Sequence, residues 1–376
     1  MSSSTSTWRR VWYAAITAII IQSVWIGGGY GSGREIVEFI AKYGAWGPLA
    51  IISGTVTLAI ALIPSLEIAR VFKAYDYMSW SKQFLWKFWW IFDIAFIVLS
   101  WIVIAVVGAA AGYMLSDLVG IPYWLSATIV LVAISLLHFF GRKAIEAWWI
   151  VGTIGLYAAY FIVWAVILIN KGSLALSNIS RGLSRGTPTD AIIDGFRYTM
   201  YNLCVVMPAL QSVDRFKGKF ESVLATVFSI ILVYGAAAVL WLCLMAYYPD
   251  VVNFTAPVYD ILKVLNIPWV LAIYVFWIFY TLIETALGMV YAIVRRVDAQ
   301  LTLRGKHLGR VGETVLAAAI FAVSVVTAQV GLIALVAQGY GTMAWVFFAV
   351  YFVPIITIGV IRLTRPEWMK EFWSKA

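Results

Sequence analysis

Charged residues are scarce in this chain of 376 residues. Asp, Glu, Lys and Arg make up 12% of it, whereas hydrophobic residues make up 63%. Soluble globular proteins contain about 25% charged and about 45–50% apolar residues. A soluble fold of this size could not bury so much apolar surface. The composition excludes an ordinary soluble enzyme and a disordered chain, and the long apolar runs argue against a transmembrane β-barrel.

Cysteine, histidine and catalytic motifs are also lacking. The two cysteines, Cys204 and Cys243, lie in apolar runs, and there are two histidines. So few of them make neither a zinc motif nor a disulfide framework. The chain has no nucleotide-binding loop, no HExxH motif and no Gly-x-Ser-x-Gly motif. We therefore expect no enzyme activity and no cofactor apart from a coupling ion. The net charge of +9 is read as topology information, and no nucleic-acid partner is expected.

Long apolar segments dominate what is present. A helix needs about 20 mostly apolar residues to cross the hydrocarbon core of a bilayer. Ten segments qualify, so we predict an all-α polytopic membrane protein with ten transmembrane helices in one domain, 1–376. The predicted spans are residues 11–43, 45–70, 87–116, 122–140, 145–170, 191–213, 220–248, 268–294, 311–328 and 329–361.

The distribution of basic residues predicts the orientation. Twenty of the 27 Lys and Arg residues fall on one side if ten spans alternate, and cytoplasmic loops carry the excess of positive charge. We therefore expect both termini in the cytoplasm of a plasma-membrane protein, with residues 363–376 as a cytoplasmic tail. The oligomeric state is left open.

Ten spans divide into two halves, residues 11–170 and 191–362. Five is an odd number, so the halves must be inverted relative to each other. The first span of each half is interrupted near its middle, by Gly27–Gly33 in one half and by Tyr201–Asn202, followed by Pro208, in the other. Interrupted segments at matching positions of two halves indicate a transporter binding site. We expect spans 1 and 6 to be unwound at mid-membrane.

The glycine-rich interruption has a physical consequence. Each glycine costs about 1 kcal/mol in a helix relative to alanine, and five of the seven residues 27–33 are glycine. Unwound backbone at membrane depth is tolerated only inside protein or beside a cavity. It exposes N–H groups that suit an anion and carbonyls that suit a cation. The alternative is that the glycines only permit close helix packing.

The segment from Gly27 to Phe39 resembles the YkvI-type membrane proteins, a prokaryotic branch of the amino acid–polyamine–organocation superfamily. The resemblance implies the LeuT-type fold with inverted five-helix repeats and a substrate held between the breaks of spans 1 and 6. It also implies that a Gly-Ser-Gly offers its N–H groups to a substrate carboxylate. Two glycine clusters could take this role, Gly27–Gly29 and Gly31–Gly33. The substrate-binding residues expected are Gly27, Gly28, Gly29, Tyr30, Gly31, Ser32, Gly33, Tyr198, Tyr201 and Asn202.

Glu284 is the charged residue predicted deepest in the membrane. Thr281, Glu284 and Thr285 are spaced i, i+3 and i+4, so they share a helix face. The resemblance implies a sodium site built from such span-8 oxygens and from span-1 carbonyls before the break, which we assign to Ile26. A carboxylate in this set would bind a sodium ion more tightly or replace it with a titrating proton. The alternative is a structural acid that is paired with a polar neighbour.

Other polar residues near the breaks have two interpretations each. Asn202 could bind substrate or cap the second half-helix. Gln22 and Ser23 could line the inner vestibule. Arg34, Glu35, Glu38 and Arg197 are a candidate outer gate or, equally, solvated charges at helix ends. The remaining features are Glu67 and Asp93, which we interpret as inner interface charges or an inner ion-pair network, and Gln338–Gly341, which interrupts the last span.

The features together favour a secondary active transporter in the lipid bilayer. We expect a small-molecule substrate, an amino acid or related amine, moved by alternating access and coupled to a proton or sodium gradient. A transporter of the same fold for an inorganic ion or a nucleobase is the alternative within this class. A channel or a membrane receptor without transport is the alternative from a different class.

Overall fold

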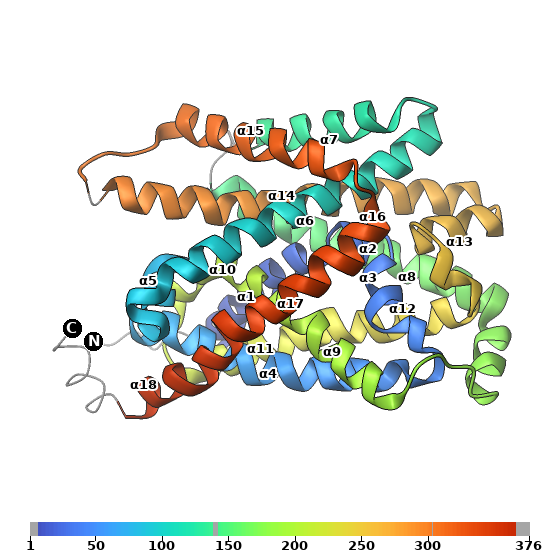
Figure 1. The fold of residues 1–376 in the computed structure, drawn as a ribbon, viewed down its shortest axis with the longest axis horizontal. Helices are drawn as coiled ribbons and strands as arrows, with labels where there is room; N and C mark the ends of the chain where they lie inside the picture. The colour runs from blue at the N-terminus through green and yellow to red at the C-terminus, as the bar shows by residue number, and fades with distance from the viewer. Residues whose placement is uncertain (1–6, 138–141, 303, 366–376) are drawn as a thin grey trace.

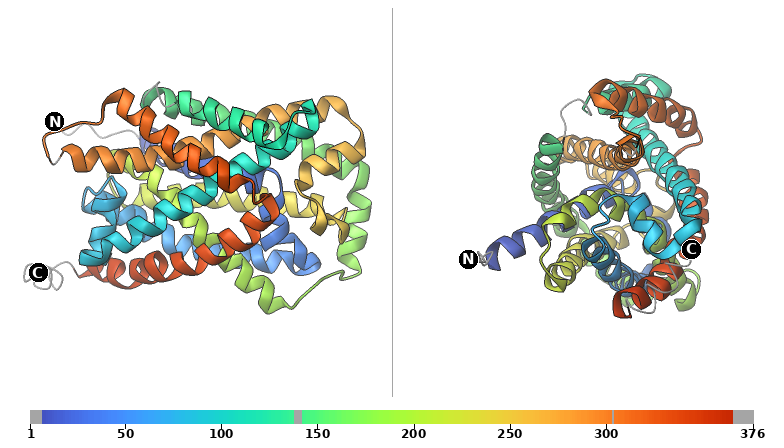
Figure 2. Two further views of the ribbon diagram at one scale, coloured as in Figure 1. Left: turned by 45° about the horizontal axis from the view of Figure 1, so that its top comes forward. Right: turned by 90° about the vertical axis from the view of Figure 1, so that its left-hand side faces the viewer.

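The computed structural model describes residues 7–137, 142–302 and 304–365. Within these ranges the chain is helical with short connections and contains no strand. Most helices run along the long axis of the molecule (Figure 1). Helices α5 and α18 lie at one end of this axis and α13 lies at the other (Figures 1 and 2). This is the all-α architecture that the apolar segments predict.

The first half of the chain runs to the end of α8. Gly120 ends α6 with φ 73°, and α7 begins just after Pro122, so glycine and proline mark this connection as expected. The predicted residues 138–140 of span 4 lie outside the described residues. The elements are α1 (Thr7–Trp25), α2 (Gly28–Gly31), α3 (Arg34–Phe39), the 3-10 helix η1 (Ala41–Trp46), α4 (Gly47–Val71), α5 (Tyr77–Leu85), η2 (Trp86–Phe88), α6 (Trp89–Val119), α7 (Tyr123–Leu137) and α8 (Arg142–Ser180).

The second half begins at Thr187, which caps α9 in a reciprocal capping box with Asp190. Residues 366–376 of the expected tail lie outside the described residues. The elements are α9 (Pro188–Asn202), η4 (Leu203–Val205), α10 (Val206–Ala209), η5 (Leu210–Arg215), α11 (Lys219–Ile230), η6 (Ile231–Gly235), α12 (Ala236–Met245), η7 (Asp250–Asn253), α13 (Pro257–Leu265), α14 (Pro268–Thr302), α15 (Gly309–Ala328), α16 (Leu332–Ala334), η8 (Leu335–Tyr340), α17 (Gly341–Phe347), η9 (Phe348–Phe352), η10 (Ile355–Gly359) and α18 (Val360–Thr364).

Seven helical stretches of the described residues are long and apolar enough to cross a membrane. Three predicted spans are not among them. The first is cut at Trp25, and α7 and α9 are described over only 15 residues each. The ten-span count therefore stays a prediction. The seven are Ala41–Val71, Tyr77–Val119, Trp149–Ser180, Lys219–Met245, Pro268–Thr302, Gly309–Ala328 and Leu332–Thr364.

One predicted connection is wrong. Helix α8 continues through Gly172 to Ser180, where the sequence predicts a loop. A single glycine costs a helix about 1 kcal/mol, which a helix of 39 residues tolerates.

The second half of helix α1 lies inside the molecule, while its N-terminal part is exposed. The helix packs against α8, α10, α11 and α14, while α2 packs against α6 and α14. Nearly all of the second half of α1 is buried. The glycine-rich segment that follows α1 is therefore enclosed by helices of both halves of the chain, which places it where a site between the halves would form.

Candidate functional site

The first helix is interrupted at the glycines. Helix α1 ends at Trp25, the N–H of Gly27 donates to the Trp25 carbonyl at 2.9 Å, and α2 begins at Gly28. Gly33 then takes φ 86°, a left-handed conformation that favours glycine, before α3 begins. Residues 27–33 are all buried. The position of the interruption agrees with the sequence, and its depth in a membrane stays a prediction.

Two of these glycines also permit close approach by polar side chains. A Cβ atom on Gly27 would lie 2.6 Å from the Oγ1 atom of Thr285. A Cβ atom on Gly29 would collide with the Oε1 atom of Glu35. Close packing at these glycines is therefore present, while unwinding at mid-membrane stays a prediction.

The second predicted interruption is milder. Helix α9 ends at Asn202, and the next three residues form the 3-10 helix η4. The chain thus changes from α to 3-10 geometry without leaving the helical form. Asn202 has helical backbone angles and its Nδ2 atom donates to the Tyr198 carbonyl at 2.9 Å. It does not act as an N-cap, because its side chain turns back toward α9.

A small closed cavity lies between the two interruptions. Its volume is about 10 Å3, which is room for roughly one water molecule. Five of its wall residues are among the predicted site residues, namely Gly27, Gly28, Glu35, Asn202 and Thr285. The other wall residues are Val24, Trp25, Val103, Cys204, Val205, Met289 and Tyr340.

Tyr198 and Tyr201 tie the two interruptions together. The Nε1 atom of Trp25 donates to the Tyr198 hydroxyl at 2.9 Å. The hydroxyl of Tyr201 donates to the Oε2 atom of Glu35 at 2.8 Å. The ring of Tyr201 stacks on that of Tyr340 with 4.4 Å between centroids. Tyr340 lines the cavity. It belongs to Gln338–Gly341, the segment that the sequence indicated as an interruption of the last span.

The remaining residues of the glycine-rich segment do not line the cavity. The Tyr30 hydroxyl donates to the Val233 carbonyl at 2.8 Å, in the π-helical η6. The Gly31 carbonyl accepts from the hydroxyls of Tyr274, at 2.9 Å, and Tyr160, at 3.3 Å. Ser32 donates to the Gly29 carbonyl at 3.0 Å. These contacts hold the segment against α8, η6 and α14.

The predicted ion-coupling residues face different neighbours. Thr285 Oγ1 donates to the Ser23 carbonyl at 3.2 Å and lies beside the cavity. Glu284 is fully buried against Gly152 of α8, and among the described residues neither of its carboxyl oxygens has a hydrogen-bond partner. The Thr281 hydroxyl also lacks a partner within the described ranges, and Ile26 is fully buried. The carboxyl of Glu284 therefore lies against α8.

Gln22 and Ser23 bond to α8 and do not line the cavity. The Thr153 hydroxyl donates to Gln22 Oε1 at 2.8 Å and lies 2.9 Å from Ser23 Oγ. All three residues are buried. They form a polar cluster between α1 and α8, on the same side of α1 as Glu284.

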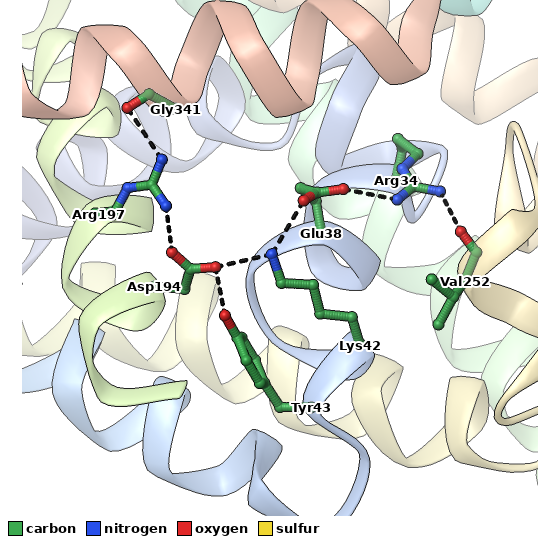
Figure 3. A network of polar contacts seen from close by, with 8 residues as sticks. All are labelled: Arg34, Glu38, Lys42, Tyr43, Asp194, Arg197, Val252 and Gly341. Atoms are coloured by element: carbon green, nitrogen blue, oxygen red, sulfur yellow. Dashed lines mark hydrogen bonds and ion pairs between the residues drawn. The ribbon is translucent and has the colours of Figure 1, made fainter. Parts of the chain in front are cut away.

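Three of the four residues predicted as an outer gate belong to one polar network, while their role as a gate stays a prediction. Figure 3 shows Arg34 donating to Glu38 at 2.8 Å, and Lys42 bridging Glu38 at 3.0 Å and Asp194 at 2.8 Å. Asp194 also pairs with Arg197 at 2.5 Å, and Arg197 donates to the Gly341 carbonyl at 3.2 Å. The network thus connects α3, η1, α9 and α17.

Glu35 does not belong to this network, although the sequence groups it with Arg34 and Glu38. It lies one residue after Arg34 on a helix, where neighbouring side chains point in different directions. It lines the cavity, and its side chain contacts Gly29 and Tyr201. Lys42 and Asp194 are members of the network that the sequence did not indicate, because their contacts depend on the fold.

Acidic residues also pair near the end of the molecule at which α5 lies. Arg70 pairs with Glu67 at 2.7 Å, and Arg296 pairs with Asp93 at 3.1 Å. These contacts fit the interpretation of Glu67 and Asp93 as an ion-pair network. Arg10 of α1 holds Glu221 of α11 by two hydrogen bonds of 2.7 and 2.8 Å, and Glu221 is fully buried.

Among the described residues, no group of three or more His, Cys, Asp or Glu side chains is placed to hold a metal ion.

No protein family model and no curated protein matches the sequence. Solved structures do match. A Na+-coupled sialic acid symporter in a substrate-bound outward-open state has a TM-score of 0.65 at 12% identity, covering 90% of this chain and 79% of that one. MhsT in complex with L-phenylalanine has a TM-score of 0.64 at 12% identity, covering 95% and 89%. A manganese transporter of Eremococcus coleocola, the H236A mutant, has a TM-score of 0.55 at 13% identity, covering 98% and 90%.

These similarities concern the fold. They confirm the LeuT-type fold that the sequence resemblance implies, while membership of the superfamily and of its YkvI-type branch stays a prediction. Together with the seven apolar helices, they indicate a multi-pass membrane protein with a fold that solved transporters use.

Proposed function

We propose that this protein is a secondary transporter that moves a small solute, an amino acid or related amine, by alternating access. The observation that supports this most strongly is the closed cavity between the α1–α2 interruption and η4. It lies between the halves of the chain and is lined by polar residues from both. A carrier needs such a site, enclosed and reachable from either side in turn.

The topology we propose has ten spans, with both termini in the cytoplasm of the plasma membrane. Residues 11–170 and 191–362 would be the two inverted repeats. The end of the molecule that holds α5 and α18 would face the cytoplasm, and α13 would lie outside (Figure 1). This assignment is supported by the excess of Lys and Arg in the loops at the proposed inner side.

Two polar networks would close the cavity in turn. The network from Arg34 to Arg197 in Figure 3 would be the outer gate, because it joins α3 and η1 to α9 and α17. The pair of Arg10 and Glu221 would fasten the inner end of α1 to α11. Both networks are intact in this structure, which agrees with a state that is closed on both sides.

Glu284 would couple transport to an ion gradient. An ionised carboxyl without partners is costly inside a membrane protein, so such residues hold a proton or a cation. Thr281 and Thr285 on the same helix, with the Ile26 carbonyl at the end of α1, would supply further oxygens. Sodium and a proton both suit this arrangement.

Transport assays in proteoliposomes test the proposal. Vesicles are preloaded with one unlabelled solute at a time: glycine, serine, methylamine or ethanolamine. If that solute is a substrate, its labelled form added outside should accumulate transiently by counterflow, and the rate should saturate with concentration. An imposed sodium or proton gradient should drive net uptake. Conductance far above carrier rates would contradict the proposal, as would the absence of counterflow for every solute.

A further inference from the structure

Glu35 is a buried carboxyl on the wall of the central cavity. Its exposed fraction is 3%. Within the described part of the chain, no Lys or Arg side chain pairs with it. The nearest arginine in the sequence, Arg34, pairs with Glu38 and donates to the carbonyls of Val252 and Phe254. The site thus contains an acidic group whose counter-charge the described chain does not supply.

The carboxyl also lies against the glycine-rich segment. It accepts a hydrogen bond from the Tyr201 hydroxyl at 2.8 Å. The absence of a side chain at Gly29 makes room for it. The Tyr201 hydroxyl, a donor that could bind an external anion, is therefore already used by Glu35.

Aromatic rings pack around Tyr201, the hydroxyl of which donates to the carboxyl. Tyr201 lies between Tyr340, at 4.4 Å between ring centroids, and Phe39, at 5.5 Å. The ring of Tyr198 is 5.9 Å from that of Tyr201 and 5.8 Å from that of Trp25. Aromatic faces attract cations, and organic ammonium groups are recognised by aromatic cages of this kind.

We propose that Glu35 is the binding carboxylate for an ammonium group, and that the substrate is a small amine without a carboxylate. This inference rests on the proposed transport function and selects the amine within it. Like charges brought together in a buried site are strongly disfavoured, so an amino acid would place its carboxylate against Glu35. An amine would supply the missing counter-charge.

Matched pairs of ligands test the inference on the wild-type protein. Glycine differs from methylamine, and serine from ethanolamine, by the carboxylate alone. Thermal unfolding of the purified protein with each ligand measures binding, because a ligand that binds only the folded state raises its stability. We expect each amine to bind at least about tenfold more tightly than its amino acid.

Two variants assign the effect to Glu35. Glu35→Gln keeps the size of the side chain and should abolish the shift caused by the amines. Glu313→Gln makes the same chemical change next to Arg295, at a residue that does not line the cavity, and should leave the shift unchanged. The wild-type comparison of ligand pairs stands even if Glu35→Gln does not fold.

Several results would overturn the inference. Tighter binding of glycine or serine would do so, as would the absence of any shift with the amines or an unchanged amine shift in Glu35→Gln. If Glu35→Gln kept its affinity for amines but lost only the pH dependence of binding, Glu35 would bind a proton and not the substrate. Counterflow of amino acids would support the transporter proposal even if the proposal of an amine substrate failed. Channel-like conductance of the amines would contradict the transporter proposal but not the binding of amines by Glu35.

Discussion

Glu35 and Glu284 are both buried carboxyls, but their surroundings differ. Glu35 lies on the cavity wall and accepts a hydrogen bond from Tyr201. Glu284 faces Gly152 on α8, and its oxygens have no partner among the described residues. Proximity to the cavity suits substrate binding by Glu35, and separation from it suits a coupling role for Glu284.

Glu284→Gln should uncouple transport from the ion gradient. The amide cannot release a proton and does not attract a cation as a carboxylate does. We expect gradient-driven uptake to fall to the level seen without a gradient, while counterflow continues. Proteoliposome uptake with and without the gradient measures this, with Glu313→Gln as the matched control. Full gradient-driven uptake by Glu284→Gln would show that the carboxyl is structural.

Gly29→Ala should weaken substrate binding. The added methyl group would collide with the Glu35 carboxyl and push it from its place on the cavity wall. We expect the affinity for the substrate to fall at least about tenfold, or ~1.4 kcal/mol, as measured by ligand-induced thermal shift.

Gly172→Ala is the control for this substitution. A Cβ atom there would meet only Leu168, at an ordinary 3.8 Å, and Gly172 lies inside helix α8. We expect unchanged affinity and a stability within about 1 kcal/mol of the wild type. Equal effects of the two alanines on binding would remove Gly29 from the site.

At the scale of elements, the sequence predicted the interruption of the first helix better than that of the second. Glycines disfavour a helix wherever they stand, so their effect is local and readable from the sequence. Tyr201 and Asn202 have no such local effect, and the chain there only tightens into the 3-10 helix η4. Five residues that the sequence predicted for the site line the cavity. The sequence did not indicate Trp25, Cys204 and Met289, because apolar residues of a cavity wall cannot be told from core residues by their type.

The network of Figure 3 also shows that contacts between distant elements cannot be read from local sequence. Three of the residues predicted as a gate, Arg34, Glu38 and Arg197, belong to the network, but the sequence did not show that Lys42 and Asp194 connect them (Figure 3). The separation of Glu35 from Arg34 depends on the direction of each side chain around the short helix α3. The spacing indicates that Glu35 and Arg34 face different directions once both lie in one helix, but it does not indicate which neighbours each side chain meets.

Lys42→Met should weaken the outer gate. The substitution removes the bridge between Glu38 and Asp194 while keeping a long side chain. Lys42 is partly exposed, and water weakens its ion pairs. We therefore expect the free-energy difference between the closed and outward-open states to shift by only about 1–2 kcal/mol toward the outward-open state, which raises the population of that state by a factor of about 5–30. Cys204 on the cavity wall is buried in the closed state. A membrane-impermeant thiol reagent should therefore label it faster from outside by that factor.

Lys263→Met provides the comparison, since Lys263 pairs with Asp117 in an exposed contact outside the network. Its labelling rate should equal that of the wild type. Cys204→Ala gives the background from Cys243. An unchanged rate in Lys42→Met would show that the network does not control access to the cavity.

At the scale of the whole molecule, composition predicted the class and the apolar runs predicted most of the helices. Seven stretches qualify as spans by length and apolarity, and the other three depend on how broken or short helices are placed in the bilayer. Helix propensity and hydropathy describe single segments. They do not determine whether two short helices joined at a break together cross a membrane.

Reporter fusions at two loops test the topology. Residue 185 precedes α9 and residue 217 follows η5, so the segment between them crosses the membrane only if the predicted sixth span exists. Alkaline phosphatase should be active when fused after Arg185 and inactive when fused after Lys217. Green fluorescent protein should give the opposite pattern. Equal activities at the two positions would remove this span and the inverted repeat.

Labelling of Cys204 from the two sides of the membrane tests the central claim, that the cavity opens alternately. The measurement uses oriented vesicles and a membrane-impermeant thiol reagent, applied outside or inside, with Cys204→Ala as background. We predict labelling from each side, slowed from both by a saturating substrate. Labelling from only one side, or none from either side, would contradict alternating access to this cavity.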